Sequence, residues 1–225
     1  MSPLLEVCNL RYRYPDGTDA LRGIDFRMNS GECVALLGPN GSGKTTFALH
    51  LAGLLKGEGS VALHGKVGIV FQNADDQLFM QTVLEDVAFG PMNQGLTTTE
   101  AHARATECLD RVGMAHAASK APYHLSAGEK RRVAIAGVLA MQPDLLVFDE
   151  PTTSLDPPAE RELIKLLRAL PQAKLLVTHD VPFARALASR AVFFEHGQVA
   201  ADGPIDNVID RFDWDFPQSV SPDRR

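Results

Sequence analysis

An α/β fold with a mostly parallel sheet is predicted by three features of this 225-residue sequence. Short apolar runs alternate with stretches of helical periodicity, a pattern typical of strands that are buried on both faces of a parallel sheet. The N-terminal part differs, because its apolar residues flank a turn and indicate paired antiparallel strands. Residues of about 82–141 contain no strong strand pattern, which predicts a helical subdomain inserted into the α/β core.

The antiparallel strands are predicted at 4–10 and 24–28, around a turn at Asp16 and Gly17. Buried strands are predicted at 33–37, 67–71, 145–148 and 175–178 because these runs are continuously apolar. Helical spacing predicts helices over 44–55 and 160–170. Further helices are expected from about 97 to 112 and from about 126 to 140. Each of these two opens with a capping box, formed by Thr97 with Glu100 and by Ser126 with Glu129.

The composition excludes several functional classes. Lys and Arg number 22 against 28 Asp and Glu, which gives a net charge of −6 and argues against a nucleic-acid partner. The three cysteines form no C-x-x-C pair, and no histidine has metal-site spacing, so neither a disulfide scaffold nor a zinc site is expected. The first residues lack the features of a signal peptide, and no apolar run is long enough to span a membrane. We therefore expect a water-soluble chain in a reducing compartment.

A phosphate-binding loop is predicted between the strand at 33–37 and the helix that follows it. Residues 38–45 read Gly-Pro-Asn-Gly-Ser-Gly-Lys-Thr and match G-x-x-x-x-G-K-[ST] in full. Glycines allow the backbone N–H groups to wrap closely around phosphate oxygens, and the helix adds its positive end. Lys44 is expected to contact the β- and γ-phosphates, and Thr45 to ligate Mg²⁺. The predicted phosphate-binding residues are Gly38, Asn40, Gly41, Ser42, Gly43, Lys44, Thr45 and Thr46.

Two carboxylates, Asp149 and Glu150, follow directly after the apolar strand at 145–148. In enzymes with a phosphate loop, the first such acid supports the Mg²⁺ shell, so we assign this role to Asp149. Glu150 is placed to polarise an attacking water. The structural alternative is that Glu150 only caps the turn formed by the next residues.

Five further motifs identify a family resemblance. Residues 125–129, Leu-Ser-Ala-Gly-Glu, resemble the signature peptide of ATP-binding cassette (ABC) ATPases, Leu-Ser-Gly-Gly-Gln. Gln72 matches the Q-loop of that family, 154–156 the D-loop, and His179 the switch histidine. Tyr14 matches the aromatic residue that stacks on adenine. The motifs occur in the order of the family and span nearly the whole chain.

The resemblance implies an ABC ATPase core that binds ATP and Mg²⁺. It implies one domain over 1–225, with a β subdomain and RecA-like core over about 1–81 and 142–210. The helical subdomain would span 82–141, and 211–225 would form a C-terminal tail. Two copies would enclose ATP, so that the signature of one copy meets the γ-phosphate bound by the other. The resemblance implies that Lys44, Glu150 and His179 are catalytic, and that Thr45, Gln72 and Asp149 bind Mg²⁺. It implies that Tyr14 and Gln72 bind ATP. The signature contacts would come from Ser126, Ala127, Gly128 and Glu129, and the D-loop contact from Asp156.

Simpler structural roles remain open for several of these residues. Tyr14 could pack on an edge strand, and His179 could be a hydrogen-bonded histidine at a strand end. Asp156 could act only as the N-cap of a helix, and Glu129 could only complete a capping box. Ala127 replaces a glycine of the signature, and a positive φ at this position would be strained.

The segments 71–79, 85–93 and 130–141 closely resemble energy-coupling factor ATPases, including those of cobalt and nickel importers. Such importers pair two ATPase subunits with a membrane T component and a substrate-binding S component. The T components carry short arginine-containing motifs in their coupling helices. Asp75 and Asp76 are therefore expected to pair with such an arginine. The alternative is a solvated acidic turn.

We expect an ATP-hydrolysing importer subunit that forms a homodimer on the cytoplasmic face of the cell membrane, as a peripheral protein. The chain is short for the shared members of this branch, which favours a dedicated importer. Cobalt or nickel is the first expected substrate, and biotin or another vitamin the alternative. A DNA-repair or chromosome ATPase is the rival from another class, but 72–125 is too short for its coiled-coil insertion. A non-catalytic adaptor is disfavoured by intact Lys44, Glu150 and His179.

Overall fold

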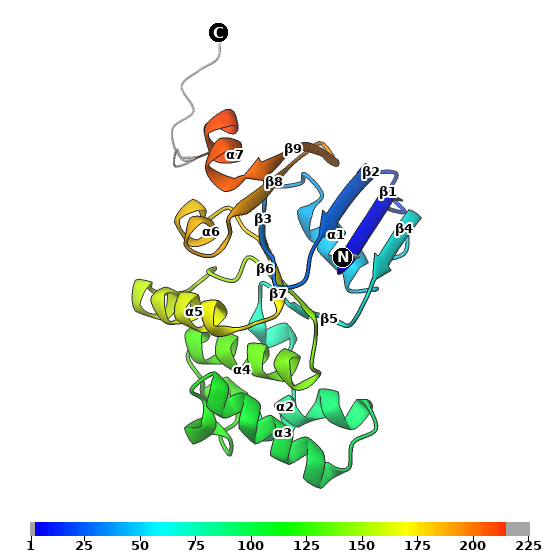
Figure 1. The fold of residues 1–225 in the computed structure, drawn as a ribbon. Helices are drawn as coiled ribbons and strands as arrows, with labels where there is room; N and C mark the ends of the chain where they lie inside the picture. The colour runs from blue at the N-terminus through cyan, green and yellow to red at the C-terminus, as the bar shows by residue number, and fades with distance from the viewer. Residues whose placement is uncertain (1–2, 215–225) are drawn as a thin grey trace.

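The computed structural model describes residues 3–214, which form two sheets and the helices around them (Figure 1). The larger sheet has six strands in the order β5-β6-β7-β3-β8-β9. Its neighbours pair in parallel except for β8 and β9, which are antiparallel. The predicted mostly parallel sheet is thus confirmed. The strands are β3 (Cys33–Leu37), β5 (Val67–Val70), β6 (Leu145–Asp149), β7 (Ala173–Val177), β8 (Arg190–Glu195) and β9 (Gln198–Pro204).

The smaller sheet is antiparallel, with strand order β2-β1-β4. Strands β1 (Leu5–Arg13) and β2 (Asp19–Met28) are the predicted N-terminal pair. The turn between them is closed by hydrogen bonds between the main chains of Tyr14 and Thr18 and of Gly17 and Tyr14. The third strand, β4 (Glu58–Leu63), was not predicted, because its residues are mostly exposed and show no apolar run.

Seven α-helices connect or cover the sheets in the described part of the chain. Both predicted capping boxes are present, at the starts of α3 and α4. A third, formed by Thr82 and Glu85, opens α2 and follows the same sequence pattern. The helices are α1 (Lys44–Leu51), α2 (Val83–Asn93), α3 (Thr98–Arg111), α4 (Ala127–Ala140), α5 (Pro157–Ala169), α6 (Val181–Leu187) and α7 (Ile205–Phe212), with short 3₁₀ turns that include η1 (Ala74–Asp76).

Two helix boundaries differ from the sequence expectation. Helix α1 ends at Leu51 rather than near residue 55, because Gly53 adopts a left-handed conformation with φ 72°. Helix α5 begins at Pro157 rather than at residue 160. Its start is fixed by the Asp156 side chain, which accepts a hydrogen bond from Ala159 N at 2.8 Å.

The central parallel strands β3, β6 and β7 are buried on both faces of the larger sheet. Leu145 and Val147 of β6 pack in one apolar cluster with Phe47 of α1 and with the antiparallel sheet. The alternate residues Leu146 and Phe148 pack in a second cluster with α2, α3, α4 and α5. In Figure 1 the helices α2, α3 and α4 lie together at the end of the molecule away from α7. The carboxyl ends of the parallel strands are therefore held between two packed layers.

The last described residues, at the end of α7 and just after it, also pack on the core. The Phe212 ring stacks on Phe193 at 3.8 Å, and the Trp214 ring meets Phe193 edge-on at 5.1 Å. The predicted tail over 211–225 lies outside the described residues from 215 onward. Among the residues that are described, no helix has the length and apolar character needed to cross a bilayer.

Candidate functional site

The predicted phosphate loop connects β3 to α1, and glycine is required at both ends of it. Gly38 has φ 135°, and a Cβ atom there would lie 2.1 Å from the Phe194 carbonyl oxygen. Gly43 has φ 102°, and its Cβ would lie 2.5 Å from the Ala20 carbonyl oxygen. A side chain at either position would clash with main-chain atoms. The loop can therefore adopt this path only with the glycines of the motif.

Lys44 is the first residue of α1, and its side chain curls back into the loop. Its Nζ donates hydrogen bonds to the carbonyl oxygens of Gly38 at 2.8 Å and Pro39 at 2.9 Å. Burial lowers the pKa of the Lys44 ammonium, while the nearby charges of Glu150 and Asp149 raise it. This places a positive charge beside the loop main chain, where phosphate oxygens would bind.

Asp149 ends β6 next to Thr45 of α1. The Thr45 hydroxyl donates to Asp149 Oδ1 at 3.3 Å. Burial raises the pKa of Asp149, and the hydrogen bond from Thr45 opposes that shift. A hydroxyl and a carboxylate at this separation are oxygen ligands of the kind that Mg²⁺ prefers, and Gln72 lines the same cavity. These residues fit a Mg²⁺ site.

Glu150 and His179 meet between the ends of β6 and β7. Glu150 adopts a left-handed conformation, with φ 46°, and its N–H donates to the Val177 carbonyl oxygen at 2.8 Å. Its Oε2 lies 2.8 Å from His179 Nδ1 and accepts a hydrogen bond from Thr178 Oγ1 at 3.4 Å. A non-glycine residue rarely occupies this region of φ, and such residues cluster at functional sites.

One cavity of about 510 Å³ brings most of the predicted nucleotide-site residues together. Gly38, Ser42 and Asp149 do not line it, although all three are buried within the adjoining loop or strand end. Four lining residues were not predicted, because no motif covers Thr18, Asp19, Ala20 or Val177. Its lining consists of Tyr14, Thr18, Asp19, Ala20, Asn40, Gly41, Gly43, Lys44, Thr45, Thr46, Gln72, Glu150, Val177 and His179.

Tyr14 lies at the rim of this cavity and is partly buried. Its hydroxyl is 3.0 Å from Thr46 Oγ1, and its ring meets Tyr12 edge-on at 4.9 Å. The strand-packing role and the cavity-lining role are therefore both present in the structure. One face of an aromatic ring next to a phosphate loop suits a nucleotide base.

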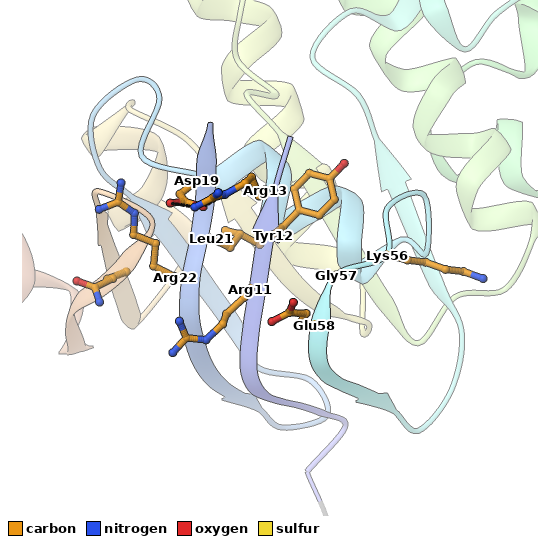
Figure 2. A pocket seen from close by; sticks show the side chains of 10 residues that line it. Arg11, Tyr12, Arg13, Asp19, Leu21, Arg22, Lys56, Gly57 and Glu58 are labelled. Carbon is orange, nitrogen blue, oxygen red and sulfur yellow. Dashed lines mark hydrogen bonds and ion pairs between the residues drawn. The ribbon is translucent and has the colours of Figure 1, made fainter. Parts of the chain in front are cut away.

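A larger hollow of about 950 Å³ lies beside the antiparallel sheet and shares one residue with the nucleotide cavity. The shared residue is Asp19, whose carboxylate accepts two hydrogen bonds from Arg13, at 2.6 and 2.9 Å (Figure 2). Arg11 and Arg22 stand opposite each other in the β1–β2 register. None of the sequence motifs falls in this hollow, and it contains neither the phosphate loop nor the carboxylates of β6.

The signature residues form a separate surface at the start of α4. Ser126 Oγ accepts from Glu129 N at 3.3 Å, and Glu129 Oε2 accepts from Ser126 N at 2.8 Å. The Ser126 hydroxyl also donates to Glu129 Oε2, at 2.9 Å. The two hydrogen bonds that the carboxylate accepts, first the one from Ser126 N and then the one from the Ser126 hydroxyl, lower the pKa of Glu129. The adjoining hollow of about 380 Å³ is lined by Ser126, Ala127, Gly128, Glu129, Arg132, Ser154, Leu155, Asp156, Pro158, Ala159 and Glu162. It shares no residue with the nucleotide cavity, so the structure does not bring the two predicted half-sites together in one chain.

The alanine at the signature glycine position is not strained. Ala127 is the first residue of α4 and does not have a positive φ. Gly128, by contrast, is closely packed, since a Cβ there would lie 3.1 Å from Ala159 Cβ. The condition under which Ala127 would be strained therefore does not arise in this chain.

The loop after Gln72 is held against α4. Lys130 pairs with Asp75 at 2.6 Å, and the Asp76 side chain accepts from Asn73 Nδ2 at 3.2 Å. Arg131 donates to the carbonyl oxygens of Phe71 and Gln72, the latter at 2.6 Å. No sequence motif signals the contacts of Lys130 and Arg131, because they join positions far apart in the chain.

Comparisons with other proteins show the family of this chain. The family model described as "ABC transporter" matches residues 21–153, which is more than half of the chain. The energy-coupling factor transporter ATP-binding protein EcfA of Methanothermobacter thermautotrophicus is 48% identical over 219 residues, covering 89% of this chain and 70% of the relative. A relative with this identity and coverage shows the family of the chain as well as its fold.

Solved structures give the same result. The cbiO1 protein from Clostridium perfringens, described as part of the ABC transporter complex cbiONQ, superposes with a TM-score of 0.84 at 36% identity, covering 94% of this chain and 92% of its own. The ATP-binding cassette MJ0796, solved as a dimer bound to ADP and Pi, gives 0.80 at 28% identity and covers 89% of this chain and 98% of its own. The chain therefore belongs to the ATP-binding subunits of ABC transporters, as an ATPase of the energy-coupling factor type.

Proposed function

We propose that this chain hydrolyses ATP with Glu150 as the general base, in an importer that takes up cobalt or nickel. The observation that carries the catalytic assignment is the 2.8 Å contact between Glu150 and His179 in the cavity that Lys44 and Gln72 also line. The carboxylate accepts a proton from the attacking water, and His179 holds the carboxylate in position. Lys44 would exchange its carbonyl partners for oxygens of the β- and γ-phosphates.

The remaining residues of the cavity position the nucleotide. Loop N–H groups from Gly38 to Thr46 would bind the phosphates, and Tyr14 would stack on the adenine. Thr45, Asp149 and Gln72 would hold Mg²⁺, which supplies Lewis-acid stabilisation of the phosphate charge. Their oxygen atoms either line the cavity or lie within hydrogen-bond distance of its lining.

A homodimer would complete each site. The signature residues Ser126 and Gly128 line a hollow that is separate from the cavity of their own chain. Ser126 caps α4, and a capped helix N-terminus offers N–H groups to an anion. We therefore propose that the signature of one copy contacts the γ-phosphate bound by the other, with Asp156 of the D-loop at the same interface. The dimeric cassette among the similar structures supports this arrangement.

The membrane T component would bind near the Q-loop. Phe79, seven residues after Gln72, and Phe89 and Met92 of α2 are exposed to 63%, 38% and 43%, and contiguous exposed apolar side chains mark partner surfaces. Phe79 and Phe89 line a small hollow between α2 and α4, and their rings meet edge-on at 5.0 Å. Asp76 of η1 is exposed and lies three residues before Phe79 in the sequence. The Asp75 carboxylate is already paired with Lys130. We therefore expect Asp76 to be the main partner of a T-component arginine.

The proposed substrate is cobalt or nickel, captured by a separate S component. The resemblance of 71–79, 85–93 and 130–141 to the ATPases of cobalt and nickel importers supports this choice over biotin or another vitamin. In such an assembly the chain would sit as a peripheral subunit on the cytoplasmic face of the cell membrane. The ATPase itself would not touch the transported ion.

Affinity capture of the Glu150→Gln variant from its native membranes tests the proposal. Slowed hydrolysis should trap the ATP-bound dimer on its membrane partners. We expect a T component and a small S component that retains cobalt or nickel, measured by mass spectrometry and elemental analysis. Retained biotin would reject the metal assignment, and recovery of no membrane protein would reject the importer assignment.

A further inference from the structure

We propose that Arg131 is a positioning residue that ties the Q-loop to the signature helix and so couples the two ATP sites of the dimer. The inference rests on the proposed roles of Gln72 and Ser126. Neither the phosphate-loop motif nor the signature motif includes Arg131. Its contacts nevertheless link one residue of the nucleotide cavity to the helix that carries the signature.

The Arg131 guanidinium forms hydrogen bonds with the main chain of the Q-loop. Its two terminal nitrogens donate to the carbonyl oxygens of Phe71 and Gln72, which are consecutive residues. The planar fork of arginine matches two adjacent acceptors, whereas lysine offers a single point charge. The Gln72 side chain lies next to these carbonyl groups along the chain and reaches the nucleotide cavity. Its position is therefore set in part by Arg131.

Burial makes this contact strong. Arg131 is only 3% exposed, so water cannot replace the carbonyl groups if the arginine is removed. The ion pair of Lys130 with Asp75 joins the same two elements, but the Asp75 side chain is 63% exposed and such pairs contribute little. The other Q-loop bonds remain within the loop region, from Phe71 N to Gln77 Oε1 and from Gln77 Nε2 to the Ile69 carbonyl oxygen. Of the hydrogen bonds and ion pairs among the described residues, those of Arg131 are thus the buried ones that join the loop to α4.

Helix α4 carries the link to the opposite site. Arg131 lies five residues after Ser126, which is roughly 7.5 Å along the axis at 1.5 Å per residue. A helix segment this short moves as a rigid unit. A shift of Gln72 that follows γ-phosphate binding in one site therefore moves Ser126 and Gly128, which serve the other site. Such a shared rigid element is the physical requirement for coupling between two sites.

The test compares Arg131→Met, Arg131→Lys and Gln72→Ala, and the double variant Arg131→Met with Gln72→Ala, in the full-length chain. We expect Arg131→Met to lower kcat by about 2- to 30-fold, the range found along coupling networks, with KM for ATP nearly unchanged. The Hill coefficient for ATP should fall toward one, and Arg131→Lys should restore part of kcat. The double variant should be no slower than Gln72→Ala alone, since both changes act through one side chain.

Lys174→Met is the matched control. Lys174 is also a buried cation that donates to two carbonyl oxygens, of Leu170 at 2.6 Å and Gln172 at 2.8 Å, but it stands at the opposite end of its strand from the cavity. The Lys174→Met variant should have a lower Tm and an unchanged Hill coefficient for ATP. If Arg131→Met also changes only the Tm, or if the double variant shows additive losses, the coupling proposal is wrong.

Two further results separate this proposal from the proposed function. If Arg131→Met does not fold, the same kinetic comparison with Arg131→Lys decides, because a lysine keeps the positive charge but replaces the two terminal nitrogens of the guanidinium fork with a single nitrogen. Normal turnover of Glu150→Gln would overturn the catalytic assignment itself. Slow turnover of Glu150→Gln with unchanged cooperativity in the Arg131 variants would overturn only the coupling role.

Discussion

His179 Nδ1 lies 2.8 Å from Glu150 Oε2, and the two residues come from loops that follow different strands of the parallel sheet. Glu150 has a left-handed backbone, and its N–H donates to the Val177 carbonyl oxygen at the end of β7 at 2.8 Å. Thr178 adds a hydrogen bond to the same carboxylate oxygen. Two consecutive residues after β7 therefore hold one carboxylate at the end of β6.

Replacing Glu150 by Gln should reduce ATP turnover by about 10²- to 10⁴-fold, the usual loss for a general base. The amide keeps the size of the side chain but cannot accept a proton from water. ATP binding should persist, because Lys44 and the loop N–H groups remain in place. Phosphate release and light scattering with ATP would measure turnover and dimer formation.

The contact between Glu150 and His179 can be tested with a variant of His179. His179→Ala should also slow turnover, and the double variant should lose much less than the product of the two single losses. The exposed residue Glu107 of α3 provides a control, since Glu107→Gln makes the same chemical change far from the cavity. Fully multiplicative losses would show that the two residues act independently.

The Asp149→Asn variant should be more stable than the parent at neutral pH. Burial raises the pKa of Asp149, so the folded state disfavours its ionised form. A raised pKa in an acid contributes stability at low pH that is lost as the pH rises through the folded pKa. The advantage of the variant should therefore grow from acidic to neutral pH and then level off.

Urea unfolding of both proteins at a series of pH values would measure this difference. Comparing the two proteins cancels the titration of the other carboxylates. The same variant should lose Mg²⁺-dependent turnover, because an amide is a poorer ligand than a carboxylate. A stability difference that is constant with pH would show that Asp149 does not titrate in this range.

Restoring the signature glycine should not improve the enzyme. Ala127 has helical backbone geometry, so Ala127→Gly relieves no strain and instead adds chain entropy to the unfolded state. The free energy of unfolding should fall by about 0.5–1 kcal/mol, with no gain in kcat. Gly137→Ala in the same helix should act in the opposite direction, because a Cβ there meets no atom within 4 Å. A rise in kcat for Ala127→Gly would show that the methyl group obstructs the trans contact.

The motifs that were predictable are those encoded within a few consecutive residues. The glycines of the loop at 38–45, the capping boxes of α3 and α4, and the acids that end β6 each depend on local geometry. Strand β4 escaped prediction because its stability comes from pairing with β1 rather than from an apolar pattern. The contacts of Arg131 with Gln72 and of Asp19 with the cavity depend on tertiary packing, which no local pattern encodes.

The last prediction concerns assembly with the T component. Asp76→Lys should abolish co-purification of the T component, because a lysine would repel the arginine that we expect there. ATP binding should stay intact, since Asp76 does not line the nucleotide cavity. Asp75→Asn should weaken assembly less, because its carboxylate is already engaged by Lys130. Asp110→Lys on the exposed face of α3 controls for the change in net charge. Normal co-purification of the T component with Asp76→Lys would show that η1 is only a solvated acidic turn. An equal loss of co-purification in Asp110→Lys would show that net charge, and not a specific pair, is responsible.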